Sequence, residues 1–274
     1  MDQIRWADSA AVSQPLPGVY HIEAQPGIFV TLLTGRRRSL LVDTGLGLGD
    51  LRRTVEGLAE GPLTVVNTHG HIDHFGGNYQ FGQVYIRAGE METARDSLAP
   101  LHLENLAPDQ PILDGRDPRS WGAAEWYDRS FAHARDLPDG MVFDLGGLTV
   151  MPVPLPSHTP GMTGFYVEER GLLLGGDSVC TLVNLCLPGA SSVEEHLRVL
   201  LAAGEIPFTH LLTSHSERLL GRGDFDGFVA CARAYDGQKA ARYRDPLYPD
   251  IAGRMFIHDD GQGHTGIIVS RQKF

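Results

Sequence analysis

The residues with the clearest chemical potential lie in one short stretch that carries three histidines and an aspartate. They are His69, His71, Asp73 and His74. Neutral imidazoles and carboxylates are the ligands that Zn²⁺ and similar first-row ions take in proteins. The stretch follows the apolar run 63–66 and precedes two glycines, which predicts a metal-binding loop at the end of a strand. A polar loop with surface histidines is the alternative that this stretch alone leaves open.

Three further candidate ligands also stand directly after apolar runs. His158 follows residues 150–153, Asp177 follows 172–174 and His215 follows 211–213. Each by itself is more often a hydrogen-bonded polar residue than a ligand. Together with the first stretch they make five histidines and two aspartates, enough for two metals that share a carboxylate. The other histidines carry no motif and are expected to be structural or exposed: His21, His102, His133, His196, His210, His258 and His264.

Composition excludes several classes of function. The chain has 274 residues, 42% of them apolar and 21% charged, which is ordinary for a folded protein. Its formal net charge is −11, and it lacks the basic stripe that tracks phosphates, so nucleic acid is not expected as a partner. No segment resembles a signal peptide or reaches membrane-spanning length, so no membrane partner is expected and the cytosol is the expected compartment.

The three cysteines do not form a disulfide framework of the kind found in secreted proteins. Buried packing is the simpler role for them, and a pocket thiol is the alternative. They are Cys180, Cys186 and Cys231.

Apolar periodicity predicts a chain that alternates strand hairpins with helices. Strands are expected at 19–23, 28–33, 39–43, 63–67, 83–86, 141–145, 148–153, 163–167, 172–174, 209–213, 255–258 and 265–269. Helices are expected at 50–59, 90–98, 192–203 and 225–235, the third capped by Ser192 with Glu195. Two facing sheets with helices outside would bury these runs.

We expect one domain over 1–274, with two additions to its plan. Residues of about 88–140 are rich in proline and aromatic side chains and predict an irregular insertion with one or two short helices. Its aromatic residues would either line a substrate pocket or pack the insertion. Residues of about 255–270 predict a final hairpin.

The order of these motifs resembles the metallo-β-lactamase superfamily. The resemblance rests on His-x-His-x-Asp-His, then His158-Thr-Pro-Gly, then Gly-Gly-Asp177-Ser, then Ser-His215, and runs from about residue 19 to about 235. It implies an α/β fold, the four-layer αββα sandwich, with metals at one edge. Asp43 matches the family's early aspartate, which braces the metal loop without binding metal.

The resemblance also implies a ligand assignment. Carried over by position, two divalent metals are held, with zinc expected and iron or manganese as alternatives. The first metal takes His69, His71 and His158; the second takes Asp73, His74 and His215; and Asp177 bridges them.

Within the superfamily, the motif at His158 looks like the glyoxalase II branch. The presence of Asp177 speaks against true β-lactamases, which lack it. Cys180 stands where acyl-homoserine lactonases carry a tyrosine, and no basic helical tail of the glyoxalase II kind is evident. The exact subfamily is therefore open.

These features predict a metal-dependent hydrolase acting on a small molecule, with homo-oligomers left open. A hydroxide that bridges the two metals would attack the carbonyl of an ester, thioester or lactone, with Asp73 as the catalytic residue that orients it and moves a proton. One alternative is a mononuclear iron dioxygenase acting on persulfides. A second is a metal-binding module without turnover.

Overall fold

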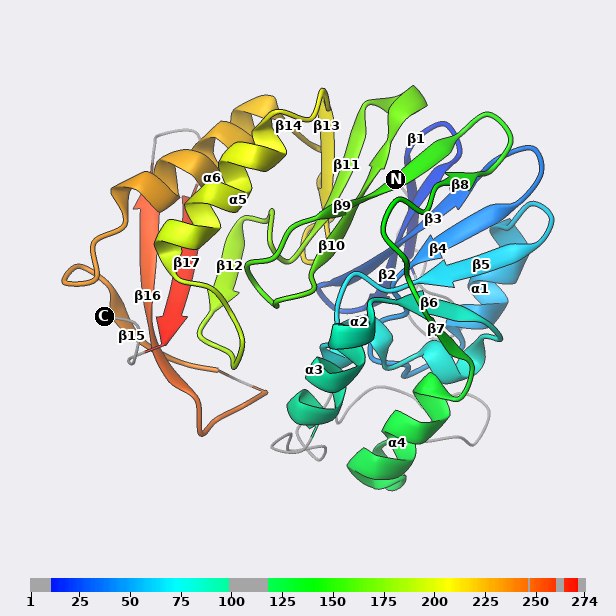
Figure 1. Cartoon of the computed structure of the whole chain (residues 1–274), viewed down its shortest axis with the longest axis horizontal. Helices are drawn as coiled ribbons and strands as arrows, with labels where there is room; N and C mark the ends of the chain where they lie inside the picture. Colours follow the sequence, from blue (N-terminus) through cyan, green and yellow to red (C-terminus); the bar gives the residue numbers. More distant parts are fainter. Residues whose placement is uncertain (1–10, 99–117, 246, 260–263, 271–274) are drawn as a thin grey trace. The chain divides into compact units, whose positions relative to one another are not determined.

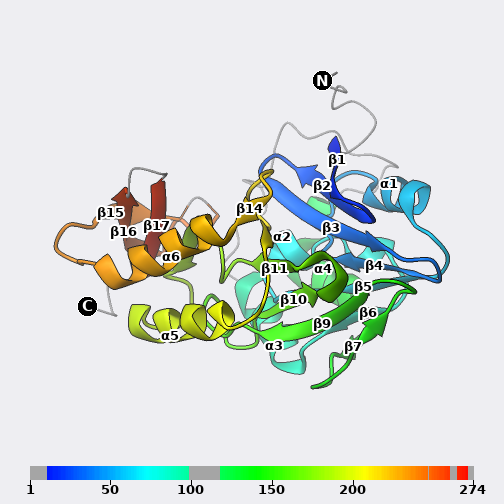
Figure 2. The same cartoon turned by 90° about the horizontal axis from the view of Figure 1, so that it is seen from above.

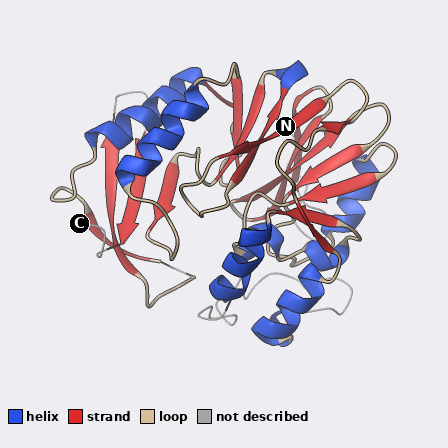
Figure 3. Ribbon diagram, in the orientation of Figure 1, coloured by secondary structure: helices blue, strands red, loops and turns tan. Residues whose placement is uncertain are grey.

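The structure, a computed structural model, describes residues 11–98, 118–245, 247–259 and 264–270. Its chain divides into two compact units, Met1–Met151 and Pro152–Phe274. Figure 3 shows that both contain helices and strands. The single domain expected over 1–274 stays a prediction.

The first unit is built on a sheet of seven strands that pair in sequence order (Figure 1). The first four strands are antiparallel neighbours, and the last three continue the sheet in parallel. The strands are β1 (Ala11–Leu16), β2 (Val19–Gln25), β3 (Ile28–Thr34), β4 (Ser39–Val42), β5 (Leu63–Val66), β6 (Val84–Ile86) and β7 (Ala134–Asp136). Parallel strands need crossover connections, and these place loops at the carboxyl end of β5.

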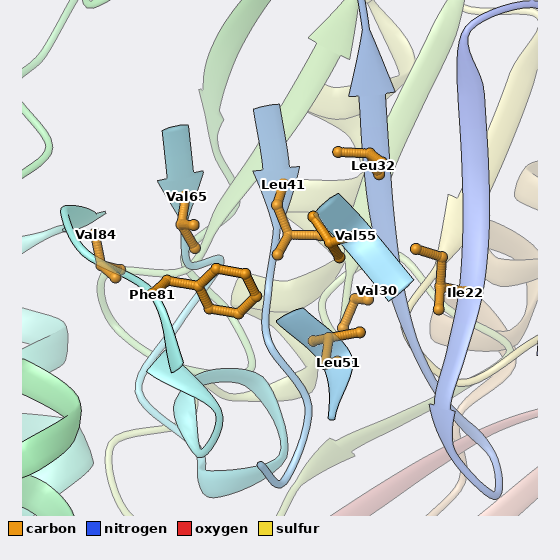
Figure 4. Close-up of a cluster of buried hydrophobic side chains, with 9 residues drawn as sticks. All are labelled: Ile22, Val30, Leu32, Leu41, Leu51, Val55, Val65, Phe81 and Val84. Carbon is orange, nitrogen blue, oxygen red and sulfur yellow. The ribbon is translucent and has the colours of Figure 1, made fainter. Parts of the chain in front are cut away.

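Helix α1 (Leu51–Leu58) makes the crossover between β4 and β5. Asp50 caps it by accepting a hydrogen bond from the Arg53 amide. Leu51 and Val55, four positions apart, lie on one face of the helix and are buried. Figure 4 shows them packed against strand residues in a core of Ile22, Val30, Leu32, Leu41, Leu51, Val55, Val65, Phe81 and Val84. This core fixes the strands that carry the histidine-rich loop.

The segment after β5 forms a series of short helices, and it differs in part from the expected insertion. The helices are α2 (Ile72–Phe75), η1 (Asn78–Gln80), α3 (Ala88–Leu98), η3 (Pro118–Ser120) and α4 (Gly122–Phe131). The first of these helices begins inside the histidine motif, at Ile72. Strand β7 was not predicted and adds part of this segment to the sheet. The expected prolines at 100–111 lie outside the described residues.

A second sheet has the order β14-β13-β11-β10-β9-β8. Gly146 and Gly147, both with positive φ, form the turn between β8 and β9, which lies between the two predicted strands. β11 and β13 are parallel, whereas β8 with β9, β10 with β11 and β13 with β14 are antiparallel. The strands are β8 (Phe143–Asp144), β9 (Thr149–Pro154), β10 (Thr163–Val167), β11 (Leu172–Gly176), β13 (His210–Thr213) and β14 (Leu220–Gly221), with a helical turn η4 (Glu168–Arg170) between β10 and β11.

A third sheet, which was not predicted, has the order β12-β17-β16-β15. Its strands are β12 (Leu182–Leu185), β15 (Ala241–Arg244), β16 (Ala252–Asp259) and β17 (His264–Ser270). β16 and β17 form the expected final hairpin, and β12 joins β17 in parallel. Helix α6 (Arg222–Ala234) contacts β16 and β17 and lies beside α5 (Val193–Gly204), as Figures 1 and 2 show. The predicted Ser192–Glu195 capping box is present in α5.

Two further expectations concern the chain as a whole. Within the described residues, no helix has both the length and the apolar character that crossing a bilayer requires. All three cysteines are buried and none forms a disulfide. The absence of a disulfide framework agrees with the sequence prediction.

Candidate metal centre

Strand β5 delivers the first group of predicted ligands, and all four lie close together. His71 is the N-cap of the short helix α2, which turns Asp73 and His74 back toward the strand end. His69 Nε2 lies 3.1 Å from His71 Nδ1, and the His69 and His74 rings are 3.9 Å apart at their centroids. An Asp73 carboxylate oxygen lies 3.6 Å from His74 Nε2. Several lone-pair donors therefore face one small volume.

Asp43 holds this loop from the end of β4. Its carboxylate accepts hydrogen bonds from the Thr68 amide at 2.7 Å and the Thr68 hydroxyl at 2.8 Å. The second oxygen also lies 2.8 Å from His74 Nδ1. Because a carboxylate oxygen accepts, Nδ1 carries the proton and Nε2 presents its lone pair. Asp43 itself is buried with φ 65°, a conformation that aspartate and asparagine tolerate better than most residues. It braces the loop, as the resemblance implied.

The backbone of the loop is fixed by a second set of buried polar groups. The His74 carbonyl accepts hydrogen bonds from the Thr44 amide at 2.8 Å and from Asn67 Nδ2 at 2.9 Å. Asn78 pairs with Asn67 through its side-chain amide at 2.7 Å. Satisfied buried groups of this kind hold one geometry. The loop therefore enters the site already ordered.

Helices α3 and α4 contribute contacts that the sequence did not reveal. Glu90, buried in α3, accepts the Gly70 amide at 2.8 Å, and the Ser97 hydroxyl donates to the Gly70 carbonyl at 3.1 Å. Trp126, fully buried in α4, donates its indole N–H to the Gly76 carbonyl at 2.8 Å. Each pair is separated by 20 to 50 positions, and no motif marks these residues. Trp126 therefore packs against the loop.

The second unit supplies the other three predicted ligands, also from strand ends. His158 follows β9, Asp177 follows β11 and His215 follows β13. The same Asp177 oxygen lies 3.1 Å from His215 Nε2 and 3.6 Å from His158 Nε2. One carboxylate thus faces two imidazoles, which is the arrangement that a bridging ligand requires.

The tautomer of His158 is fixed by a backbone carbonyl. His158 Nδ1 lies 2.6 Å from the carbonyl oxygen of Asn184 in β12. A carbonyl can only accept, so Nδ1 is protonated and Nε2 carries the lone pair. Partners of this kind on the distal nitrogen orient metal-ligating histidines. Sequence analysis missed Asn184, which lies in a strand that it did not predict.

A directed chain of hydrogen bonds fixes the backbone around His158 and Asp177. The Ser178 hydroxyl donates to the Leu155 carbonyl at 2.7 Å, so it must accept from the Ser157 hydroxyl at 2.9 Å. The Ser157 oxygen then accepts from His196 Nδ1 at 3.0 Å. Burial, with a smaller contribution from His158, lowers the pKa of His196 to about 4, so this histidine is neutral at pH 7. It is structural, as expected.

The remaining histidines without a motif have contacts consistent with structural or surface roles. His21 is buried, stacks on Phe29 and contacts Thr31, and His210 contacts the Arg170 carbonyl. His133 and His264 are exposed, and His258 is half-buried in β16. His102 lies outside the described residues.

The donor set suits a divalent metal. The predicted ligands from each unit include imidazoles and one carboxylate, the mixture that Zn²⁺, iron and manganese accept. In His74 and His158 the hydrogen-bonded nitrogen leaves the other nitrogen free of its proton, which is the state that binds metal. These residues therefore fit the metals that the motif implies.

Comparison with known families agrees with this donor set. The sequence profile described as Metallo-beta-lactamase superfamily matches residues 26–215, more than half of the chain. The chain belongs to the metallo-β-lactamase superfamily. The predicted family is confirmed. Members of the superfamily generally bind metal ions, and the described residues of this chain include histidine and aspartate groups that could hold them.

Solved structures of the superfamily share the fold. An archaeal superfamily protein from Sulfolobus tokodaii aligns with a TM-score of 0.58 and 16% identity, over 81% of this chain and 89% of that one. The sec-alkylsulfatase Pisa1 from Pseudomonas aligns with a TM-score of 0.59 and 18% identity, over 82% of this chain and 41% of that one. At these identities the likeness shows the fold, and it confirms the predicted α/β class.

A curated member of the superfamily is more similar in sequence. The human protein named acyl-coenzyme A thioesterase MBLAC2 is 30% identical over 165 residues, which cover 55% of this chain and 57% of the relative. The bovine protein of the same name is 29% identical over the same length. The chain thus matches little more than half the length of these relatives.

Proposed function

We propose that this chain is a metal-dependent thioester hydrolase that acts on a small acyl thioester. The observation that carries the proposal is the protonation pattern of its histidines: Asp43 and the Asn184 carbonyl hold the Nδ1 protons of His74 and His158, so both Nε2 atoms are ready to bind metal. The thioester, among the carbonyl substrates expected, is favoured because similar superfamily members are named acyl-coenzyme A thioesterases.

Two divalent ions, zinc in the first instance, would be held by the predicted ligands. The first ion would take His69, His71 and His158, the second Asp73, His74 and His215, and Asp177 would bridge them. When bound, such ions lower the pKa of a water to about 7 and polarise a carbonyl oxygen. Two short distances support this assignment. His69 Nε2 lies 3.1 Å from His71 Nδ1 in the first unit, and His215 Nε2 lies 3.1 Å from Asp177 Oδ2 in the second.

Asp73 is proposed to handle the proton. Its side chain is largely buried, and its Oδ2 atom lies 3.6 Å from His74 Nε2. As a carboxylate it can accept the proton of the attacking water and pass it to the sulfur that leaves. Water then adds to the carbonyl carbon, the carbon–sulfur bond breaks, and a carboxylic acid and a thiol are released.

The test is a substrate panel with two site variants and a matched control. The purified chain, supplied with Zn²⁺ or Mn²⁺, is assayed against acyl-coenzyme A and glutathione thioesters, esters, lactones and phosphodiesters. We expect thioesterase activity that His71→Ala and Asp73→Asn abolish while circular dichroism stays unchanged. His133→Ala, at an exposed histidine, should keep full activity.

Three outcomes would contradict the proposal. Full activity in both site variants would exclude the mechanism. Oxygen consumption with a persulfide and one bound iron would favour a dioxygenase. Metal binding without turnover on any substrate of the panel would favour a non-catalytic module.

A further inference from the structure

The carbonyl that orients His158 belongs to a residue that is itself held at its side chain. Asn184 Nδ2 donates to Asp245 Oδ2 at 2.9 Å, and Asn184 Oδ1 accepts the Cys186 amide at 3.0 Å. Both ends of the side-chain amide are therefore bonded. These two bonds fix the side chain of the residue whose carbonyl faces His158 Nδ1.

Asp245 is a buried carboxylate whose two oxygens have separate partners. Oδ1 accepts the amides of Leu247 and Tyr248 at 3.0 and 3.1 Å, which closes the turn after β15. Oδ2 accepts from Asn184 and from the Tyr243 hydroxyl at 3.3 Å. Burial and then the Asp245 charge raise the pKa of Tyr243, so its hydroxyl keeps the proton that it donates. One oxygen thus serves the turn and the other serves Asn184.

These residues connect His158 to the third sheet. Asn184 lies in β12, opposite Ile268 of β17, and Asp245 follows β15 at the other side of the sheet. Strands β15, β16 and β17 come after residue 215, where the match to the superfamily profile ends. The path to His158 therefore uses strands outside the matched segment.

We propose that Asp245 is a positioning residue of the metal centre, acting through Asn184 on the ring of His158. By holding the Asn184 carbonyl opposite His158 Nδ1, Asp245 directs His158 Nε2 toward the metal site. It is not itself a ligand or a catalytic group. The inference rests on the metal site of the proposed function, and it adds that the third sheet sets the affinity of that site.

The two oxygens of Asp245 allow a variant that separates this role from folding. In Asp245→Asn the remaining oxygen can still accept the two amides of the turn, while the new NH₂ group faces the NH₂ group of Asn184. The double variant Asn184→Asp/Asp245→Asn reverses the polarity of the pair. It restores the bond, and the new carboxylate at 184 can still accept the Cys186 amide.

Each variant is measured in three ways. Zn²⁺ affinity comes from competition with a chromophoric chelator, ligand geometry from the visible spectrum of the Co²⁺-loaded protein, and apo-protein stability from thermal unfolding. Asp224→Asn is the control, because Asp224 accepts the Gly221 amide at the start of α6 and has no role at His158.

We expect Asp245→Asn to weaken Zn²⁺ binding about tenfold, at the lower end of the range for residues that orient metal ligands. Its Co²⁺ spectrum should change, and the double variant should recover most of the affinity and the wild-type spectrum. Asp224→Asn should lower the melting temperature of the apo-protein and leave both metal readouts unchanged.

Two results would overturn the inference. One is wild-type affinity and spectrum in Asp245→Asn. The other is a double variant that folds like the wild type but recovers neither readout. Both require a wild-type protein that binds metal, so they are distinct from failure of the proposed function, in which the wild type itself binds no Zn²⁺ or Co²⁺.

Discussion

The two groups of predicted ligands are held by different chemistry. In the first unit, buried carboxylates hold the ligand loop: Asp43 contacts Thr68 and His74, and Glu90 accepts the Gly70 amide. In the second unit, the groups in direct contact are neutral: the Asn184 carbonyl on His158, and the serine chain that ends at His196. Removing a charge that contacts the ligand loop directly should therefore disturb the first group, whereas the second group, whose contacts named here are neutral, should be disturbed by a charge added there.

The largest expected effect is a loss of folding stability in acid, and it arises at His196 beside the second group. Burial holds the pKa of His196 near 4, whereas an unfolded histidine titrates at 6.5. Between these values the unfolded chain binds a proton that the folded chain does not. Stability is therefore complete above pH 6.5 and is lost as the pH falls toward 4, by about 3 kcal/mol for this residue.

Denaturant unfolding of the metal-free protein between pH 7 and pH 4 measures this loss. The matched variant is His196→Asn, whose amide can donate to Ser157 without titrating. It should lose less stability than the wild type over the same range. If the unfolding free energies of the two proteins fell in parallel between pH 7 and pH 4, protonation of His196 would not be the cause of the loss.

Loss of charge at Asp43 should produce the next largest effect, in the first group. Asparagine tolerates the positive φ of this position. Its NH₂ group cannot accept a hydrogen bond, so asparagine cannot keep all the bonds that the carboxylate accepts from Thr68 and His74. We expect Asp43→Asn to weaken metal binding by about 10- to 100-fold. Chelator competition measures it, and Asp50→Asn, which changes only the cap of α1, is the control. Unchanged metal affinity in Asp43→Asn would show that the Asp43 carboxylate does not control the first ligand group.

A neutral contact in the first unit should have the smallest effect. Trp126→Phe removes the indole N–H that donates to the Gly76 carbonyl and keeps most of the aromatic bulk. The expected loss is about 1 kcal/mol of unfolding free energy, with metal affinity close to that of the wild type. Urea unfolding followed by circular dichroism tests it. A drop in metal affinity as large as that of Asp43→Asn would mean that neutral contacts also control this loop.

Sequence reasoning found the parts of the fold whose signal lies in adjacent residues. Apolar runs such as 63–66 and 172–174 form the buried strands β5 and β11, and the Ser192 capping box starts α5. Strand β15 was missed because it is an edge strand that exposes Arg242 and Arg244 and has no alternating apolar pattern. Its pairing comes from β16, which periodicity within 241–244 cannot reveal.

The candidate site shows the same division. The ligands are recognisable because they are grouped in short motifs of characteristic chemistry. The residues that hold them are not, because Glu90, Trp126 and Asp245 act across separations of 20, 50 and 61 positions and are single polar groups in otherwise ordinary segments. Only the folded chain reveals which buried group each of them satisfies. Asp43 is the exception, and the family resemblance supplied it.

The parallel pairing of β12 with β17 has a consequence for synthesis on the ribosome. The first sheet pairs its strands in sequence order and can assemble as they emerge. Leu182, in contrast, pairs with Gly266, so β12 stays without this neighbour until a much later segment has been translated. The carbonyl that faces His158 would therefore reach its final position late, and a nascent chain could complete its first ligand loop well before its second group is competent to bind metal.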